Sequence, residues 1–297
     1  MFEFDTIESG AFVVSPMQIP AGSDAMVEVA GSGTNFQPGT TVAFGSGDIH
    51  VRRIWVVAPN RFLVNVVTAP DASPGPLNVT VLNGLRLLTA PSGFRVAPAN
   101  PNQTRLHGPV VDQATGFADI QAGAVASVRL AGAAAELPPS AIQISVNDKP
   151  TPVLSLAGGL LQFRVPADLP PGPAVLRLIA NGEAALPLVI SIDLPPPVVN
   201  SIQIGSLKID DKRPARAGEL LTVSVARLAE SGSEVDISRI RILAGGILHN
   251  PVLLSPASNG SYSIQFLLDS SIGSGMLPLS VRVDNRRVSD PVVLHVQ

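Results

Sequence analysis

The chain contains no cysteine, and only 4% of its 297 residues are aromatic and 14% charged. Without cysteine it has no disulfide scaffold, no thiol nucleophile and no zinc site built from thiolates. A formal net charge of −3 gives no overall field that would attract nucleic acid or an anionic membrane. The 45% of hydrophobic residues, in turn, exclude an intrinsically disordered chain. The length fits two or three folded domains of about 100 residues, or one large domain.

Long apolar runs are also missing. No stretch approaches the ~18–20 continuous apolar residues of a membrane-spanning helix, and the apolar residues come in short bursts such as 54–57 and 188–190. We therefore predict no membrane insertion. The first residues, 1–5, include two acids where a signal peptide has a basic segment. The protein either stays inside the cell or is a piece of a longer chain whose leader lies elsewhere.

Proline (28) and glycine (26) are abundant, and glycine marks a repeat. An Ala-Gly pair ends at Gly22, Gly123 and Gly218, and each glycine is followed five and seven positions later by apolar residues. These residues are Val27 and Val29, Val128 and Leu130, and Val223 and Val225. A spacing of two places both members of a pair on one face of a strand. The sequence therefore contains three copies of one unit, each about 95–100 residues long.

Asparagine marks a second landmark in each copy. Asn83-Gly84, Asn181-Gly182 and Asn285-Arg286 each lie between two alternating apolar runs. Asn-Gly at such a place predicts a β-hairpin with a type I′ turn, in which both central residues have positive φ. Arginine in the third copy indicates a different turn. The proline-rich segments 98–102 and 195–197 separate the copies and read as short, stiff spacers.

Short strands broken by turn signals predict an all-β fold, with three tandem immunoglobulin-like β-sandwich domains over 1–98, 99–197 and 198–297. Helical patterning is almost absent. The best candidate for a helix, residues 131–136, contains Gly132 and runs into two prolines, so we interpret it as a loop.

The first copy resembles the IPT/TIG group of immunoglobulin-like domains. The likeness rests on Ser15-Pro16, on the valine pair, on Gly33 followed by Phe36, and on residues 41–45. The second and third copies resemble a duplicated C-terminal domain of large secreted proteins of soil bacteria, through residues 165–174 and 281–297. The resemblance implies an extracellular or cell-surface bacterial setting as a spacer, an adhesive stalk or an attachment to a glycan-active enzyme. It implies no catalytic residue and no cofactor.

Residues that carry chemistry are scattered. The four histidines, at 50, 107, 249 and 295, have no metal-ligand spacing, and there is no nucleophile elbow or phosphate-binding loop. Asp210-Asp211 reads as a solvated turn. Glu234 and Asp236 would share one face of an extended segment, where a weak calcium site is the alternative to a polar loop. Basic residues gather near Arg52, Lys212 and Arg286, and only Trp55 lies near one of these groups, whereas a nucleic-acid surface pairs its charges with several aromatics. We predict no metal site and no nucleic-acid partner.

The single tryptophan, Trp55, shares a strand face with Arg53. It is either a packing residue or the platform of a sugar-binding site with Arg53 beside it.

From the threefold repeat and the scattered reactive residues we predict a non-enzymatic spacer or adhesive rod with a protein or cell-surface glycan partner. The alternative is a set of carbohydrate-binding modules that uses Trp55 and Arg53. The apolar last segment, 291–297, is a candidate edge strand for pairing with another module or chain. The sequence leaves the oligomeric state open.

Overall fold

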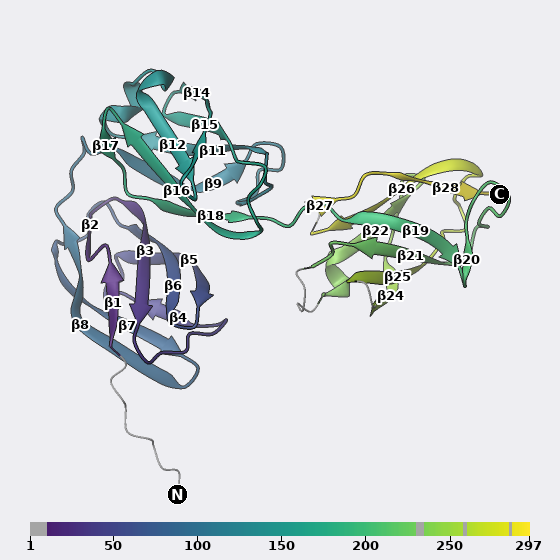
Figure 1. Ribbon diagram of the computed structural model, residues 1–297, viewed down its shortest axis with the longest axis horizontal. Coiled ribbons are helices and arrows are strands. Elements are labelled where there is room, and N and C mark those ends of the chain that lie inside the picture. The colour runs from purple at the N-terminus through teal and green to yellow at the C-terminus, as the bar shows by residue number, and fades with distance from the viewer. Residues whose placement is uncertain (1–10, 230–234, 258–259, 285–286) are drawn as a thin grey trace, which may run out of the picture. The chain divides into compact units, whose positions relative to one another are not determined.

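A computed structural model describes residues 11–229, 235–257, 260–284 and 287–297. Their strands form six sheets, which make up three β-sandwiches (Figure 1). The prediction of an all-β chain of tandem immunoglobulin-like sandwiches is confirmed. The chain divides into two compact units, Met1–Asp193 with sandwiches 1 and 2, and Leu194–Gln297 with sandwich 3. None of the described segments is a helix long and apolar enough to cross a membrane.

Sandwich 1 pairs a sheet of four strands with a second sheet of four. The first sheet runs in the order β1 (Phe12–Ser15), β3 (Asp24–Gly31), β6 (Arg61–Thr68), β5 (Ile49–Ala58). The second runs β2 (Gln18–Pro20), β8 (Arg86–Ala97), β7 (Gly75–Asn83), β4 (Thr41–Ala43). The opening segment thus crosses between sheets: β1 is antiparallel to β3, and β2 is parallel to β8. This crossing leaves the edge of β3 near Met26 without a strand partner from β1.

Sandwich 2 repeats this order. Its first sheet is β9 (Arg105–Asp112), β11 (Val125–Ala131), β15 (Leu160–Arg164), β14 (Val153–Ala157). Its second is β10 (Asp119–Ile120), β18 (Leu188–Ile192), β16 (Gly172–Ala180), β12 (Ile142–Val146), β13 (Lys149–Thr151), with β17 (Glu183–Ala184) also on β16. The expected loop at 131–136 is instead partly a 3-10 turn, η1 (Ala133–Glu136), and a second such turn, η2 (Pro139–Ala141), follows. Three residues per turn suffice to span this short connection.

Sandwich 3 has the same plan. Its first sheet is β20 (Leu207–Lys208), β19 (Val198–Ile204), β21 (Leu220–Ala226), β25 (Ser261–Leu267), β24 (Pro251–Pro256). Its second is β23 (Ile247–His249), β22 (Ile240–Ala244), β26 (Gly275–Val283), β27 (Arg287–Val288), with β28 (Val292–Val296) also on β26. A 3-10 turn, η3 (Ile237–Arg239), precedes β22.

The glycine landmark has the same geometry in all three copies. Gly22, Gly123 and Gly218 have φ of 72°, 84° and 81°, a left-handed conformation that favours glycine. The carbonyl of the residue after each glycine accepts a hydrogen bond from the amide of Thr68, Val165 or Leu268, at the last residue of β6 or directly after β15 or β25. The apolar residues five and seven positions on are buried in every copy. The predicted register of these strands is confirmed.

The asparagine hairpins agree in part with prediction. Asn181 and Gly182 both have positive φ, 50° and 82°, as a type I′ turn requires. In sandwich 1, however, Asn83 pairs with Arg86, so the turn residues are Gly84 and Leu85, and Asn83 is not left-handed. The type I′ prediction is wrong there, because the Asn83 side chain is held elsewhere: its Nδ2 donates to the Asn35 carbonyl at 2.8 Å. Asn285 and Arg286 lie outside the described residues.

Each sandwich has its own apolar core. In sandwich 1, aromatic pairs close the core: Phe36 meets Phe62 edge-on at 4.9 Å, and Phe44 meets Phe94 at 4.8 Å. Because each sandwich has its own core, each of the three copies of the repeat can form a complete β-sandwich. The exact domain limits at 98/99 and 197/198 stay a prediction.

Candidate functional site

The outer face of the first sheet of sandwich 1 is covered by sandwich 2. A strand in a two-layer sandwich buries alternate residues, yet in β3 both Met26 and its neighbours are buried, and all five residues of β18 are buried. Met26, Leu63 and Val189 form a separate apolar cluster, with Trp55 and Val175 packed against it. The two sandwiches of the first unit therefore share a desolvated contact.

Asn65 lies at the centre of this contact. Its Nδ2 donates to the carbonyl of Val189 at 2.7 Å, and its Oδ1 accepts from the Val189 amide at 2.9 Å. Both bonds are buried. Beside them the Met26 amide, on the edge that β1 leaves open, donates to the Pro187 carbonyl at 2.6 Å. One carboxamide thus satisfies both backbone groups of an edge-strand residue that would otherwise be buried unpaired.

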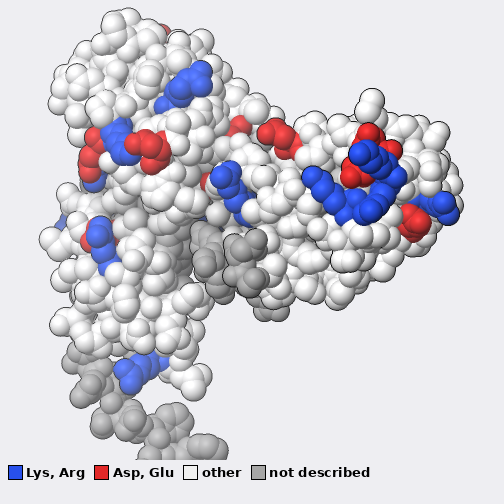
Figure 2. Space-filling view, turned by 45° about the vertical axis from the view of Figure 1, so that its right-hand side comes forward, with Lys and Arg blue, Asp and Glu red and all other residues white. Residues whose placement is uncertain are grey.

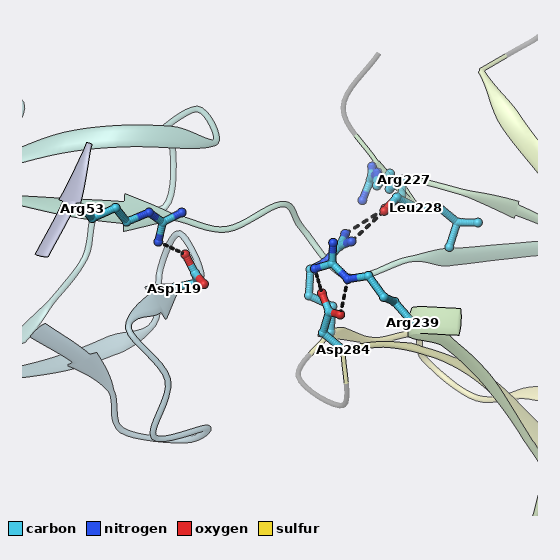
Figure 3. Close-up of polar contacts among 7 residues, drawn as sticks. Arg53, Asp119, Arg227, Leu228, Arg239 and Asp284 are labelled. Carbon is cyan, nitrogen blue, oxygen red and sulfur yellow. Dashed lines mark hydrogen bonds and ion pairs between the residues drawn. The ribbon is translucent and has the colours of Figure 1, made fainter. Parts of the chain in front are cut away.

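An ionic cluster flanks the apolar part. Asp24 Oδ2 accepts from Arg52 Nη1 at 2.9 Å and from the Gly108 amide of sandwich 2 at 2.7 Å, and the Asp24 side chain is 1% exposed. Further out, Arg53 Nη1 reaches Asp119 Oδ1 of sandwich 2 at 2.8 Å (Figure 3). The Arg53–Asp119 pair is partly exposed and adds little to stability, whereas the buried Asp24 carboxylate binds one group from each sandwich.

Two pKa values in this cluster are shifted. Burial raises the pKa of the Asp24 carboxyl above its ordinary value, although Arg52 and the Gly108 amide act against this. Burial also lowers the pKa of His107, against the opposing effect of Asp24 and with a smaller contribution from Arg105 and Arg52. The folded unit therefore holds His107 in its neutral form more strongly than the unfolded chain does.

The shift at His107 predicts a pH dependence. A histidine whose folded pKa is lowered stabilises the fold above its unfolded pKa, about 6.5, and that contribution is lost as the pH falls through the folded value. Asp24 acts in the opposite sense, since its raised pKa favours the fold at acid pH. We expect His107→Gln to reduce the loss of stability of the first unit between pH 7 and pH 5. Urea unfolding followed by Trp55 fluorescence gives the free energy of unfolding at each pH. If that free energy falls equally between pH 7 and pH 5 in the wild type and in His107→Gln, the prediction is contradicted.

Removing the Asn65 carboxamide should destabilise the first unit strongly. Asn65→Ala leaves the amide and the carbonyl of Val189 buried without partners, at a cost of about 2–4 kcal/mol. The matched control is Gln162→Ala, in the equivalent position of sandwich 2, where the side chain is half-buried and bonds Ser155. The control should change the free energy of unfolding by about 0.5 kcal/mol or less. If the two substitutions lower the free energy of unfolding equally in urea melts, the Asn65 carboxamide does not stabilise the contact as proposed.

The two predicted ligand residues lie in this contact. Trp55 is half-buried, and the Arg53 guanidinium carbon lies 5.2 Å from the centroid of its ring. Trp55 and Arg53 therefore lie on the same face of their strand, as the alternation of side chains along a strand predicts. Trp55 packs against the cluster of Met26, Leu63 and Val189, and Arg53 has Asp119 as its ionic partner. Sugar binding by this pair stays a prediction.

The remaining candidate residues are dispersed. The imidazole of His249 is buried: its Nε2 accepts from the Asp269 amide at 3.1 Å, and its ring meets Phe266 edge-on. Asp210 Oδ1 accepts from the Lys212 amide, as in the predicted turn. Asp236 accepts from the Ser238 amide and caps η3, while Glu234 lies outside the described residues. Within the described ranges, no three histidine or acidic side chains group closely enough to hold a metal ion.

One residue of the basic clusters, Arg287, has structural partners. In sandwich 3, Arg287 is 4% exposed and donates to the carbonyls of Arg227 at 3.0 Å and Leu228 at 2.6 Å, while Arg239 pairs with Asp284 (Figure 3). On the face drawn in Figure 2, basic and acidic side chains form small groups on a largely uncharged surface. Arg286 lies outside the described residues.

A groove of about 750 Å³ lies on sandwich 2. Its lining includes Gln143 and Ile179, which point outward from β12 and β16, and prolines 139 and 150. The charged side chains that line it, Asp148 and Arg177, bind each other at 3.2 Å. Such a surface can accept an apolar or uncharged group, but it holds no acid–base pair poised for catalysis.

No family model matches the chain, and no curated protein matches it. Solved structures match over most of its length at low identity. Plexin A4 (extracellular region, domains 1 to 8) is 11% identical, with 98% of this chain and 34% of that one covered and a TM-score of 0.30. The Bacteroides ovatus protein SGBP-B of a mixed-linkage glucan utilization locus, in complex with a mixed-linkage heptasaccharide, is 12% identical (94% and 65%, TM-score 0.29). Surface layer protein SbsC, domains 4–9, is 11% identical (97% and 49%, TM-score 0.29).

The chain thus spans about a third of the plexin chain and just under two thirds of SGBP-B. All three similarities fall at 12% identity or below and at TM-scores of 0.30 or below, which is too low to establish the fold. The strand order shows the fold: in sandwich 1 the first, third, sixth and fifth strands form one sheet in the order β1, β3, β6 and β5, and sandwiches 2 and 3 repeat this plan. The chain is a tandem array of immunoglobulin-like β-sandwiches.

Proposed function

We propose that the chain is a non-enzymatic spacer and interaction module of an extracellular or cell-surface bacterial protein, with IPT/TIG-like character in its first sandwich. The observation that carries this proposal is the contact centred on Asn65. A spacer must hold its modules at a fixed separation, and a desolvated contact with a two-point backbone hydrogen bond does this for sandwiches 1 and 2.

The first part of the proposal is tested by a distance measurement in the full chain. Because the chain has no cysteine, two spin labels can be placed by Thr41→Cys and Glu183→Cys, both exposed, in sandwiches 1 and 2. A second pair, Thr41→Cys with Arg61→Cys, lies within sandwich 1 and sets the width expected of a rigid body. We expect distance distributions of similar width by pulsed electron resonance. A several-fold broader distribution between the sandwiches would remove the basis of the spacer role.

The glycan-binding alternative makes a different prediction. If Trp55 and Arg53 form a sugar site, the full chain should be retained on immobilised polysaccharides and Arg53→Ala should abolish retention. Arg53→Ala is preferred to a Trp55 substitution because Trp55 also packs in the contact. The spacer proposal expects wild type and Arg53→Ala to behave alike. Retention lost in Arg53→Ala would replace the spacer with the carbohydrate-binding function.

A further inference from the structure

Val293 in sandwich 3 occupies the position that Val189 has in sandwich 2. Val189 lies opposite Val175 in β16, and Val293 lies opposite Pro278 in β26. Both ladders begin with a left-handed glycine, Gly172 or Gly275, three residues before the opposing residue. The carbonyls of Val175 and Pro278 also accept equivalent bonds from the turn after β12 or β22. The strands β18 and β28 therefore correspond residue for residue in their pairing with β16 and β26.

The backbone groups of Val293 point toward an open edge. The Pro278 carbonyl turns away from β28, toward Gly245 at 2.9 Å. Opposing residues whose groups turn away from each other are a non-hydrogen-bonded pair, so the amide and carbonyl of Val293 face outward. Ala215 covers only the end of this edge, through bonds with His295 and Gln297. No hydrogen bond to the Val293 backbone comes from the described parts of sandwich 3.

Equivalent positions differ sharply in exposure. Val189 is 4% exposed because the Asn65 face of sandwich 1 covers it, whereas Val293 is 56% exposed and Met276, beside it on β26, is 74% exposed. The neighbours of Val293 on this face are Met276 and Pro278 on β26, which are uncharged, and His295 on β28. Sandwich 3 thus presents the surface that in sandwich 2 is buried against another sandwich.

Sandwich 3 also contains a residue that corresponds to Asn65, the residue of sandwich 1 that binds the backbone of Val189. Asn65 lies opposite the fourth residue after Gly22, and Gln265 lies opposite Thr222, the fourth residue after Gly218. The Gln265 carboxamide is half-buried and has no hydrogen-bond partner in the described part of the chain. Exposed leucines surround it on the same sheet, namely Leu220, Leu253 and Leu267.

We propose that sandwich 3 is a self-association site, in which the Gln265 face of one copy docks on the β28 edge of a second copy. The Gln265 carboxamide would accept from the Val293 amide and donate to its carbonyl, as Asn65 does with Val189. The leucines of the first copy would cover Val293 and Met276 of the second. Because the two halves lie on different sheets, the contact is head-to-tail, and copies joined by it form rings or open chains. This inference does not depend on the spacer role, since self-association and a fixed distance between sandwiches 1 and 2 are measured separately.

Sedimentation velocity on the full chain, over concentrations up to about 1 mM, tests the proposal. We expect a weight-average mass that rises with concentration, since a contact this small belongs among weak interfaces. Val293→Asp places a charge against the leucines, and Gln265→Ala removes the carboxamide, so each should weaken association at least about tenfold. The matched controls, Val13→Asp on an exposed site of sandwich 1 and Gln162→Ala, should associate as wild type does.

Mixing the two variants gives the sharpest result. Val293→Asp keeps an intact Gln265 face, and Gln265→Ala keeps an intact β28 edge, so an equimolar mixture should form dimers and nothing larger. Near-UV circular dichroism of Tyr262 checks the fold of sandwich 3, and Val293→Ser replaces Val293→Asp if the latter does not fold. A wild-type chain that stays monomeric throughout, association unaffected by both variants, or a mixture with no dimer would each overturn the proposal.

Discussion

Deleting residues 291–297 is expected to unfold sandwich 3 and to leave sandwiches 1 and 2 unchanged. The deletion removes β28, which carries Leu294 and Val296, 0% and 6% exposed, into the core of sandwich 3. Burying each of these side chains is worth about 1.5–3 kcal/mol, and the deletion also breaks the β26–β28 ladder. Together these losses approach the ~5–15 kcal/mol that stabilise a whole domain.

The chain carries its own probes for this experiment. Trp55, the single tryptophan, lies in the contact between sandwiches 1 and 2, and Tyr262, the single tyrosine, packs on the core of sandwich 3. In the truncated chain the near-UV signal of Tyr262 should be lost at 25 °C, while the thermal transition seen by Trp55 fluorescence should stay where it is. A shift of the Trp55 transition would show that the two units are not independent.

Phe163→Ala should lower the stability of sandwich 1 although Phe163 belongs to the core of sandwich 2. Its ring is fully buried there, and its loss leaves a cavity that costs about 3–5 kcal/mol. In a unit of this size that corresponds to a fall in melting temperature of about 6–20 °C. The contact through Asn65 and the Met26 cluster couples the two sandwiches, so both should melt together at the lower temperature.

Differential scanning calorimetry with Trp55 fluorescence measures this effect. Because Trp55 sits on a strand of sandwich 1, its transition should fall with that of sandwich 2. The matched control is Phe266→Ala in the core of sandwich 3, where the ring is equally buried; it should leave the Trp55 transition unchanged. A Trp55 transition unaffected by Phe163→Ala would mean that sandwich 1 unfolds alone.

The repeat was the part of the fold most open to prediction. Gly22, Gly123 and Gly218 mark a conformation that glycine adopts most easily, and the alternation after them follows from strand geometry. That is why fold class and strand register could be predicted from local pattern. The turn at Asn83 could not, since the Asn83 side chain bonds Asn35, which is 48 residues away in sequence. A long-range bond of this kind leaves no local signal.

The contact between sandwiches 1 and 2 was missed for a related reason. Three signals of it exist in the sequence: the polar Asn65 inside the apolar run 62–67, the unbroken apolar run 188–190, and Met26 on the nominal outer face of β3. Each also fits an isolated strand, and only the fold places them together. Trp55 and Arg53 were singled out correctly as sharing a face, but their partners Val189 and Asp119 come from another domain.

Native-state hydrogen exchange tests the central claim most directly, namely that sandwiches 1 and 2 form one cooperative body and sandwich 3 another. The account predicts that the slowest amides of sandwich 1, such as Val64, and of sandwich 2, such as Leu178, exchange with one free energy and one denaturant dependence. Amides of sandwich 3, such as Val223, should have a different value. Distinct free energies for Val64 and Leu178, each unaffected by Asn65→Ala, would contradict the account.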